Sequence, residues 1–313
     1  IQHELDVVPG LPVDAHATGK LAKEIGAELV VADGYHFGPS FQKIMKQGYA
    51  PILIFDDYGH CEYYPANWIV NQNRSWQSSF YEQREQGSQL LTGTEHVVLR
   101  AAFRSRKPTA RRSIKEAERL LVTFGGADHR GMSARVAQAL LDFPPETPLQ
   151  VRLLIGRMAE TEALEPLVGK HGAVEIEMVR DEGEIIDHLD WADFALSAGG
   201  TTVWELLYLG VPSLILLTAG NQTSNCETLA TEGILRSLGP AEKFDPETIA
   251  EQVNALATDP ERRALYSIKG RQIVDGKGCE RIFEAIHQQT ENKDGRSREE
   301  ILLESFLNRS RKF

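Results

Sequence analysis

The chain has 313 residues, of which 42% are hydrophobic and 25% are charged. This length and composition are typical of a globular protein with two ordinary domains, since single domains usually contain roughly 100 to 200 residues. The net charge of −11 argues against a surface that follows nucleic acid or anionic lipid, so an anionic ligand would need a local site made of backbone amides or a few placed cations.

The cysteines and the hydropathy of the chain indicate the cellular compartment in which the protein works. The three cysteines, Cys61, Cys226 and Cys279, are odd in number and far apart. They fit a reducing cytoplasm better than a disulfide framework, and their spacing is not that of metal ligands. No apolar stretch approaches the ~18 residues of a membrane span, and no signal peptide is recognised. We expect a cytoplasmic protein with no membrane span, nucleic-acid partner, cofactor or metal. Its oligomeric state stays open, a monomer included.

Four short apolar runs with polar ends lie in the first third of the chain. Between the first two of them, Phe41, Ile44 and Met45 have helical spacing, and Gly48 marks a helix end. Continuous apolar strands separated by helices indicate a parallel sheet covered on both faces. The expected strands lie at 28–33, 51–57, 67–73 and 88–93.

A basic, proline-containing stretch at 104–119 is expected to connect two lobes. After it, an apolar strand, a polar or glycine turn and an amphipathic helix recur, which predicts an α/β protein with two Rossmann-like lobes that bind ligands at the carboxyl ends of their strands. The expected strands are 119–126, 149–156, 173–179, 193–200 and 212–218, and the expected helices are 132–143, 160–170, 182–192, 201–210 and 221–233. The expected first lobe covers residues 1–110 and the expected second lobe covers residues 111–288. A polar tail or helix is expected at 289–313.

Two glycine turns lie at strand-to-helix junctions of the second lobe, Gly125-Gly126 and Gly199-Gly200. Glycine lets a ligand approach the backbone closely, and the amides at a following helix start bind phosphate oxygens with help from the helix dipole. Thr201 and Thr202 can donate hydroxyls to the same oxygens. The alternative is a tight turn in which Thr201 caps the helix.

Two further polar features accompany the second turn. Glu205 lies one helical turn after Thr201 on the same face, where a carboxylate can accept both hydroxyls of a ribose, although it also nearly fits a capping box. Asn221 and Gln222 begin a helix at the same end of the sheet, with capping again the alternative. Three polar helix starts at adjacent strand ends favour a diphosphate and ribose site over capping alone.

The motifs "GYHFG", "IFDDYGH", "VNQN", "LLVTFGGAD" and "DFALSAGGTTVWELL" occur in an order that resembles a known family. The family is the UDP-2,4-diacetamido-2,4,6-trideoxy-β-L-altropyranose hydrolases of pseudaminic acid biosynthesis, which are related to MurG-type glycosyltransferases with the GT-B fold. The similarity runs from about Glu28 to Ile282. Spore-coat polysaccharide proteins share much of the pattern.

The resemblance implies roles for residues at matching positions. In the second lobe it places the stretch from Gly199 to Thr202 near a diphosphate, Glu205 near a ribose, and backbone groups of the loop around Val179 near uracil. It also makes Asn221 a catalytic residue that positions the attacking water, beside Gln222. This lobe, at 111–288, is therefore the expected UDP-binding lobe.

In the first lobe, the expected sugar-binding lobe, the resemblance places Asp33 in the substrate site and Tyr35 at the reaction centre. Asp56 and Asp57 match a pair that shapes the family's cleft; the alternative is an ordinary turn at a strand end. The sequence shows no set of carboxylates typical of a metal site, and this adjacent pair is a weak exception.

One family feature has no match here, the glycine-rich "GxGHxxR" loop whose histidine is the general base. His16 falls within a helix pattern, His36 points away from the face of Tyr35, and His129 would lie by the phosphates. We therefore expect a first lobe truncated at its N-terminus and a chain that binds UDP but hydrolyses its sugar poorly.

The expected function is hydrolysis of a UDP-linked 2,4-diacetamido-2,4,6-trideoxy sugar at the anomeric C–O bond, releasing UDP and free sugar for pseudaminic acid or surface polysaccharide synthesis. A base takes a proton from water while hydrogen bonds stabilise the leaving diphosphate. The alternative enzyme is a MurG-like UDP-sugar glycosyltransferase, although residues 1–100 lack the apolar, basic membrane-docking patch usual in those enzymes. The third interpretation is a UDP-sugar-binding protein with impaired catalysis.

Overall fold

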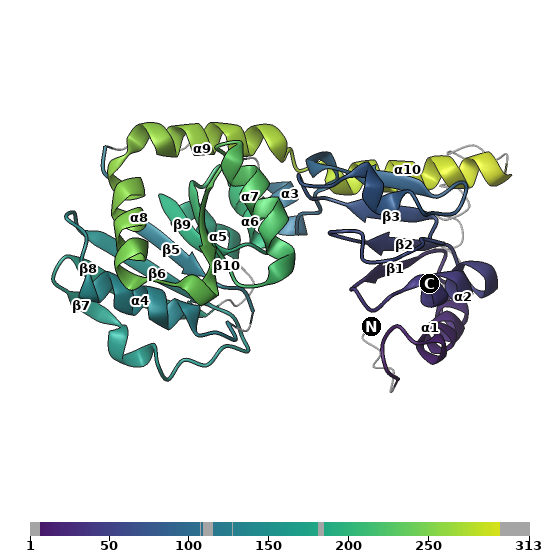
Figure 1. Ribbon diagram of the computed structural model, residues 1–313, viewed down its shortest axis with the longest axis horizontal. Helices are drawn as coiled ribbons and strands as arrows, with labels where there is room; N and C mark the ends of the chain where they lie inside the picture. The colour runs from purple at the N-terminus through teal and green to yellow at the C-terminus, as the bar shows by residue number, and fades with distance from the viewer. Residues whose placement is uncertain (1–6, 107, 109–114, 127, 181–184, 295–313) are drawn as a thin grey trace, which may run out of the picture. The chain divides into compact units, whose positions relative to one another are not determined.

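The computed structural model describes residues 7–106, 108, 115–126, 128–180 and 185–294 (Figure 1). Contacts divide the chain into two compact units. The first unit comprises residues 1–98 and 277–313, and the second unit comprises residues 99–276. Each unit contains a largely parallel sheet covered by helices, so the predicted α/β class with two Rossmann-like lobes is confirmed.

The sheet of the first unit has four parallel strands in the order β1-β2-β3-β4. All four agree with the strands expected from the apolar runs. The strands are β1 (Val30–Asp33), β2 (Ile52–Phe55), β3 (Trp68–Asn71) and β4 (Gln89–Thr92), the helices are α1 (Pro12–Glu24), α2 (Pro39–Gly48) and α10 (Gly278–Asp294), and the 3-10 turns are η1 (Ser78–Tyr81) and η2 (Thr94–His96).

Alternate residues of β2 face opposite sides of this sheet. Ile52 and Ile54 pack in one buried cluster with α1 and α2, whereas Leu53 packs with Ile282 and Ala285 of α10 in another. Figure 1 shows α10 on one side of the sheet and α1 and α2 on the other. The sheet is therefore a buried middle layer, which explains why its strands are continuously apolar.

The contacts of α10 shift the expected domain boundaries. The expected second lobe includes the stretch 277–288, but the burial of Ile282 and Ala285 against the first sheet places this stretch in the first unit. At the other end, residues 99–106 belong to the second unit rather than to a first lobe ending at 110. Within the expected tail, 289–294 continue α10 and 295–313 lie outside the described residues.

The sheet of the second unit has seven strands in the order β11-β10-β9-β5-β6-β8-β7. All are parallel to their neighbours except β7. The strands are β5 (Arg119–Thr123), β6 (Leu149–Ile155), β7 (Gly169–His171), β8 (Val174–Arg180), β9 (Phe194–Ala198), β10 (Ser213–Leu217) and β11 (Arg236–Pro240). The helices are α3 (Ala101–Ser105), α4 (Met132–Asp142), α5 (Ile185–Trp191), α6 (Thr202–Leu209), α7 (Thr223–Thr231), α8 (Pro246–Thr258) and α9 (Pro260–Ile273).

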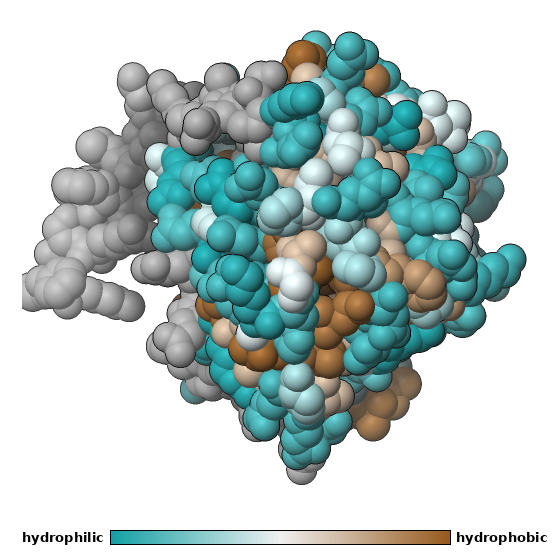
Figure 2. Space-filling model, turned by 90° about the vertical axis from the view of Figure 1, so that its left-hand side faces the viewer, coloured by the Kyte–Doolittle hydropathy of each residue, from teal (hydrophilic) through white to brown (hydrophobic). Residues whose placement is uncertain are grey.

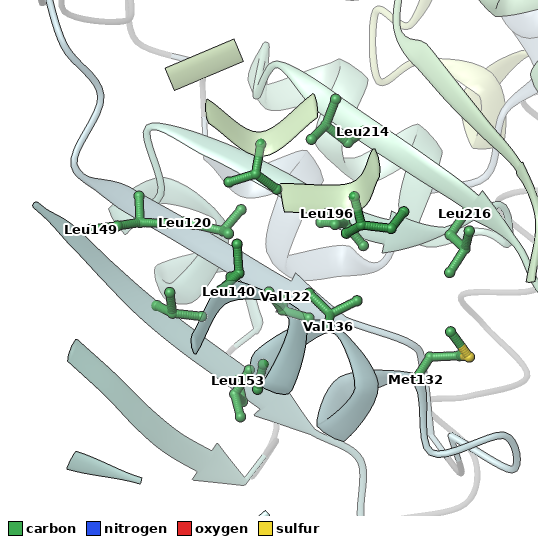
Figure 3. Close-up of a cluster of buried hydrophobic side chains, with 14 of the residues drawn as sticks. Leu120, Val122, Met132, Val136, Leu140, Leu149, Leu153, Leu196, Leu214 and Leu216 are labelled. Carbon is green, nitrogen blue, oxygen red and sulfur yellow. The ribbon is translucent and has the colours of Figure 1, made fainter. Parts of the chain in front are cut away.

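The core of the second unit lies between this sheet and its helices. Leu120 and Val122 of β5 are fully buried and meet Val136 and Leu140 of α4, while Leu196 of β9 continues the same cluster (Figure 3). The spacing of Val136 and Leu140 is one helical turn, so both face the sheet. This packing fixes the central strands and, with them, the loops at their carboxyl ends.

One expected helix is wrong. The stretch 160–170 forms only a 3-10 turn, η3 (Glu165–Leu167), and then β7, which pairs antiparallel with β8. Pro166 and Gly169, whose φ is +126°, oppose a continuous helix. A turn at Gly172, with φ of +63°, lets the chain return as β8. Residues 234–277 carried no expected elements, and β11, α8 and α9 lie there.

The exposed surface does not refine the assignment of the fold. The face of the second unit in Figure 2 is mainly hydrophilic, with apolar side chains gathered chiefly in the lower middle of the view. Among the described residues, no helix combines the length and the apolar character needed to cross a membrane.

The placement of α10 in the first unit can be tested. Ile282→Ala removes a buried side chain from the cluster that includes Leu53 and Trp68 and should destabilise the first unit by about 2 to 4 kcal/mol, seen as faster hydrogen exchange in β2 and β3. Phe283→Ala is the control, because Phe283 is the next residue and is exposed. Faster exchange confined to β5 and β9 would contradict the placement.

Candidate functional site

The order of strands in the second unit creates a switch point beside β5. From β5 the chain moves outward through β6 and β8, and then returns to form β9 on the other side of β5 before continuing to β10 and β11. Loops that follow β5 and β9 therefore lead away in opposite directions, and ligands of doubly wound sheets bind in the crevice between such loops. These two loops carry the two predicted glycine turns, at Gly125-Gly126 and Gly199-Gly200.

The turn at Gly199-Gly200 leads into a buried helix whose first amides are available. Val203 N donates to Gly200 O and Trp204 N to Thr201 O, whereas within the described part of the chain the amides of Gly200, Thr201 and Thr202 have no acceptor. The side chain of Thr201 makes no capping hydrogen bond. The plain capping alternative is therefore not what the structure shows, and the free amides are suited to phosphate oxygens.

The glycines of this turn differ in the space around them. A Cβ on Gly199 would lie 2.8 Å from Cys226 Sγ and 3.0 Å from Gln222 Cβ, so the turn packs against the start of α7. No atom lies within 4 Å of a Cβ built on Gly200. Gly199 is therefore required by the fold, whereas Gly200 leaves room for a ligand.

The turn at Gly125-Gly126 offers less to an anion. The carboxylate of Asp128 accepts from Met132 N at 2.8 Å and from Ser133 N at 2.9 Å, so it occupies amides at the start of α4 and adds a negative charge. A role for Gly125 and Gly126 in phosphate binding stays a prediction, which rests on their own amides rather than on the helix.

Sequence reasoning missed Gly156, which follows β6. A Cβ on Gly156 would lie 2.2 Å from Gly126 O, so only glycine lets the loops after β5 and β6 approach each other. Met158 N also donates to Gly126 O. The glycine was visible in the sequence, but its partner lies 30 positions earlier, and no local pattern connects them.

The polar pair that opens the next helix lies on η4 (Gly220–Gln222). Gln222 Oε1 accepts from Thr218 N at 2.9 Å, so this side chain closes its own turn, as the capping alternative holds. Its packing beside Gly199 places it next to the glycine turn. The catalytic role of Asn221 stays a prediction.

Val179 is not in a loop. It lies in β8 and pairs with Leu154 of β6, so the local structure expected for the uracil contact is wrong at this residue. Residues 181–184, which follow, lie outside the described residues, and the uracil contact near Val179 stays a prediction.

Glu205 has a partner that the sequence did not indicate. Its carboxylate is almost fully buried and receives Arg100 Nε at 2.6 Å and Nη2 at 2.7 Å. This is a bidentate, charge-assisted pair. The predicted ribose carboxylate is therefore occupied by an arginine 105 positions earlier in the chain.

In the first unit, the predicted residues gather at the carboxyl ends of β1 and β2. Tyr35 Oη donates to Asp57 Oδ2 at 2.5 Å, and Asn73 Nδ2 donates to Asp57 Oδ1 at 3.0 Å. Desolvation and the nearby charge of Asp57 raise the pKa of Asp33. Asp33, Tyr35 and Asp57 thus form one group, as their shared position at parallel strand ends predicts.

Asp56, in contrast, is structural. Its side chain is fully buried and accepts from the amides of Tyr58 and Gly59, from His60 Nδ1 at 3.1 Å, and from the hydroxyl of Tyr64. Burial alone would raise the pKa of Asp56, but these hydrogen bonds outweigh it and lower the pKa. The first residue of the pair thus forms a turn, and the second faces the candidate site.

His60 was not singled out by sequence reasoning. Burial alone would lower its pKa, but its interactions with Asp56 and Cys61 raise it to about 10. Of the histidines considered as a base, His16 is exposed on α1 as expected and bonds Tyr49 Oη, and His36 stacks on Phe37. Among the described histidines, His60 is the one paired with a carboxylate.

The Asp56–His60 pair predicts a pH dependence of stability. Because the folded pKa of His60 is raised to about 10, its contribution is complete below the unfolded value near 6.5 and is lost as pH rises through about 10. His60→Gln should therefore cost roughly 1 to 3 kcal/mol at pH 6 and much less at pH 10.

Urea unfolding at both pH values, followed by hydrogen exchange or proteolysis of the segment around β2 and β3, measures this difference. His171→Gln is the control, since His171 is exposed and its ring bonds a backbone oxygen, Leu167 O. A destabilisation by His60→Gln that is equal at pH 6 and pH 10 would contradict the raised pKa.

Comparison with known proteins adds independent similarities. The spore coat polysaccharide biosynthesis protein SpsG of Bacillus subtilis is 24% identical over 243 residues, which are 77% of this chain and 70% of that protein. The UDP-N-acetylglucosamine–N-acetylmuramyl-(pentapeptide) pyrophosphoryl-undecaprenol N-acetylglucosamine transferase of Chromohalobacter salexigens is 30% identical over 169 residues, 52% of this chain and 45% of the transferase. The chain thus spans less than half of that transferase.

Solved structures share the fold at low sequence identity. MurG of Acinetobacter baumannii matches with a TM-score of 0.61 and 15% identity over 91% of this chain and 82% of that chain. MnaA of S. aureus, solved with UDP, matches with a TM-score of 0.62 and 13% identity over 90% of this chain and 82% of that chain. These similarities confirm the predicted GT-B fold.

The second unit also matches a family model. The match covers residues 119–275, from the first residue of β5 to the end of the unit, and so includes both glycine turns, Glu205 and the Asn221-Gln222 pair. It extends over half of the chain. The chain therefore belongs to the family described as the glycosyltransferase family 28 C-terminal domain.

Proposed function

We propose that the chain binds a UDP-sugar through its second unit and acts as a glycosyltransferase in polysaccharide biosynthesis. The observation that carries this proposal is the switch point between β5 and β9, where the available amides of Gly200, Thr201 and Thr202 begin a buried helix. Such a site holds a diphosphate without a cluster of lysines, which suits a chain with a net charge of −11. A cytoplasmic location fits the same assignment.

The names of the relatives support a UDP-sugar as the ligand class. One relative is a UDP-N-acetylglucosamine transferase, and structures of the same fold were solved with UDP and with UDP-GlcNAc. SpsG is named for spore coat polysaccharide biosynthesis. These names favour sugar transfer over the hydrolysis that the motif resemblance implied.

Hydrolysis of a UDP-linked 2,4-diacetamido-2,4,6-trideoxy sugar is kept as the second candidate. The observation in its favour is the group formed by Asp33, Tyr35 and Asp57 in the first unit, since these are residues of the motifs on which the hydrolase resemblance rests. In this candidate the acceptor is water, and the first unit supplies the contacts to the sugar.

Nucleotide binding is tested at Gly200. Gly200→Ala places a methyl group in open space, so the fold should keep its stability while the affinity for UDP falls about tenfold or more as phosphate oxygens lose close approach to the amides. Isothermal titration calorimetry with UDP and UMP measures the loss and whether it depends on the β-phosphate.

Gly48→Ala is the matched control, because it also enters open space but lies at the end of α2 in the first unit. Equal UDP affinities of the wild-type chain, Gly200→Ala and Gly48→Ala would overturn the proposed phosphate site.

Product analysis separates transfer from hydrolysis. With UDP-N-acetylglucosamine as the probe, release of UDP that requires an added acceptor supports transfer, and free sugar without an acceptor supports hydrolysis. Tyr35→Phe removes the hydrogen bond to Asp57 and should lower turnover about tenfold while leaving UDP affinity unchanged.

Tyr63→Phe is the control for this change, because Tyr63 is similarly exposed and lies outside the group of Asp33, Tyr35 and Asp57. Full turnover by Tyr35→Phe would remove Tyr35 from the reaction centre.

A further inference from the structure

Arg100 and Glu205 join the segment before α3 to the helix at the switch point. The guanidinium donates two hydrogen bonds, Nε to Oε1 at 2.6 Å and Nη2 to Oε2 at 2.7 Å. The Glu205 side chain is 7% exposed and that of Arg100 is 49% exposed. The arginine therefore has a solvent-accessible side, whereas the carboxylate is buried beneath its partner.

The rest of this segment is also attached to the second unit. Arg106 Nη1 lies 2.6 Å from Asp187 Oδ1 and 3.1 Å from Asp190 Oδ2 of α5, and Tyr208 Oη of α6 donates to Arg106 O. Among the described contacts, residues 99–106 are thus attached by ion pairs at both Arg100 and Arg106. Of these, the one at Arg100 uses a residue of the proposed nucleotide site, and the one at Arg106 does not.

The position of Glu205 creates a conflict. It lies on α6 one turn after Thr201, where its carboxylate could accept both hydroxyls of a ribose if a diphosphate is bound at the helix start. Both carboxylate oxygens, however, already accept from Arg100, and little of the side chain is accessible. A ribose can reach Glu205 only if the guanidinium moves aside.

We propose that Arg100 is a specificity-determining residue of the nucleotide site, acting as a latch on Glu205 that the ribose of a bound uridine diphosphate displaces. This inference rests on the proposed function. The exchange is feasible because Arg100 is half exposed, so its released guanidinium is hydrated rather than stranded in the core. Two ribose hydroxyls then replace the two guanidinium donors on the carboxylate.

Two consequences follow. Part of the binding free energy from the ribose hydroxyls is used to release Arg100, so removing the guanidinium should increase the advantage of a ribonucleotide over a nucleotide that lacks the hydroxyls. In addition, nucleotide binding should loosen residues 99–106, although ligands ordinarily protect the segments that they contact.

The experiment compares UDP with 2′,3′-dideoxy-UDP by calorimetry in the wild-type chain, Arg100→Met and Arg106→Met. Methionine keeps an apolar stem and removes the guanidinium. The affinity ratio of UDP to the dideoxy analogue should rise about three- to tenfold in Arg100→Met and stay at the wild-type value in Arg106→Met, which breaks an ionic attachment of the same segment to α5.

Hydrogen exchange of the wild-type chain supplies a second readout that needs no variant. Peptides covering 99–106 should exchange several-fold faster with saturating UDP than without it, and should not respond to the dideoxy analogue. This measurement decides the matter if Arg100→Met does not fold.

The outcomes separate the latch from the function on which it rests. If UDP binds but neither the affinity ratio nor the exchange of 99–106 changes, the latch is overturned and the nucleotide site stands. If neither the wild-type chain nor Arg100→Met binds UDP, the proposed function is overturned together with the latch.

Discussion

The position of β5 in the sheet of the second unit is the constraint on which the candidate site depends. β5 pairs with β6 on one side and with β9 on the other, although β9 begins more than 70 residues after β5 starts. Because β5 pairs with both strands, the loop after β5 and the loop after β9 lead away from the sheet edge in opposite directions. The buried contacts of Leu120, Val122 and Leu196 hold these strands, so the hydrophobic core of the unit also sets the place of the glycine turns.

Electrostatics determines which helix start can receive an anion. At α4 the carboxylate of Asp128 already accepts from two amides, whereas at α6 the amides of the glycine turn have no such partner in the described chain. The nearest acidic group on α6 is Glu205, and Arg100 neutralises it. An acidic chain thus keeps one helix start suited to phosphate by pairing the carboxylate on that helix with an arginine from another segment.

The first unit uses a buried carboxylate for a different purpose. Asp56 holds the turn after β2 through the amides of Tyr58 and Gly59 and the side chains of His60 and Tyr64. Because that turn is fixed, its neighbour Asp57 can accept from Tyr35 and Asn73. The two adjacent aspartates therefore have separate tasks: one stabilises the turn and the other lies in the candidate site.

The sequence by itself determined all the described strands except β7 and β11, several of the helices and the glycine turn before α6, because each of these depends on residues that are close along the chain. Apolar runs such as 52–55 and 213–217 indicate buried strands by their composition alone, and a glycine pair between strand and helix indicates a turn. Only the tertiary structure decided that α10 packs in the first unit, that Gly156 meets Gly126, and that Arg100 covers Glu205. These pairings join residues from 30 to more than 200 positions apart. Such contacts depend on how whole helices and strands pack together, and the local periodicity of a sequence does not indicate that packing.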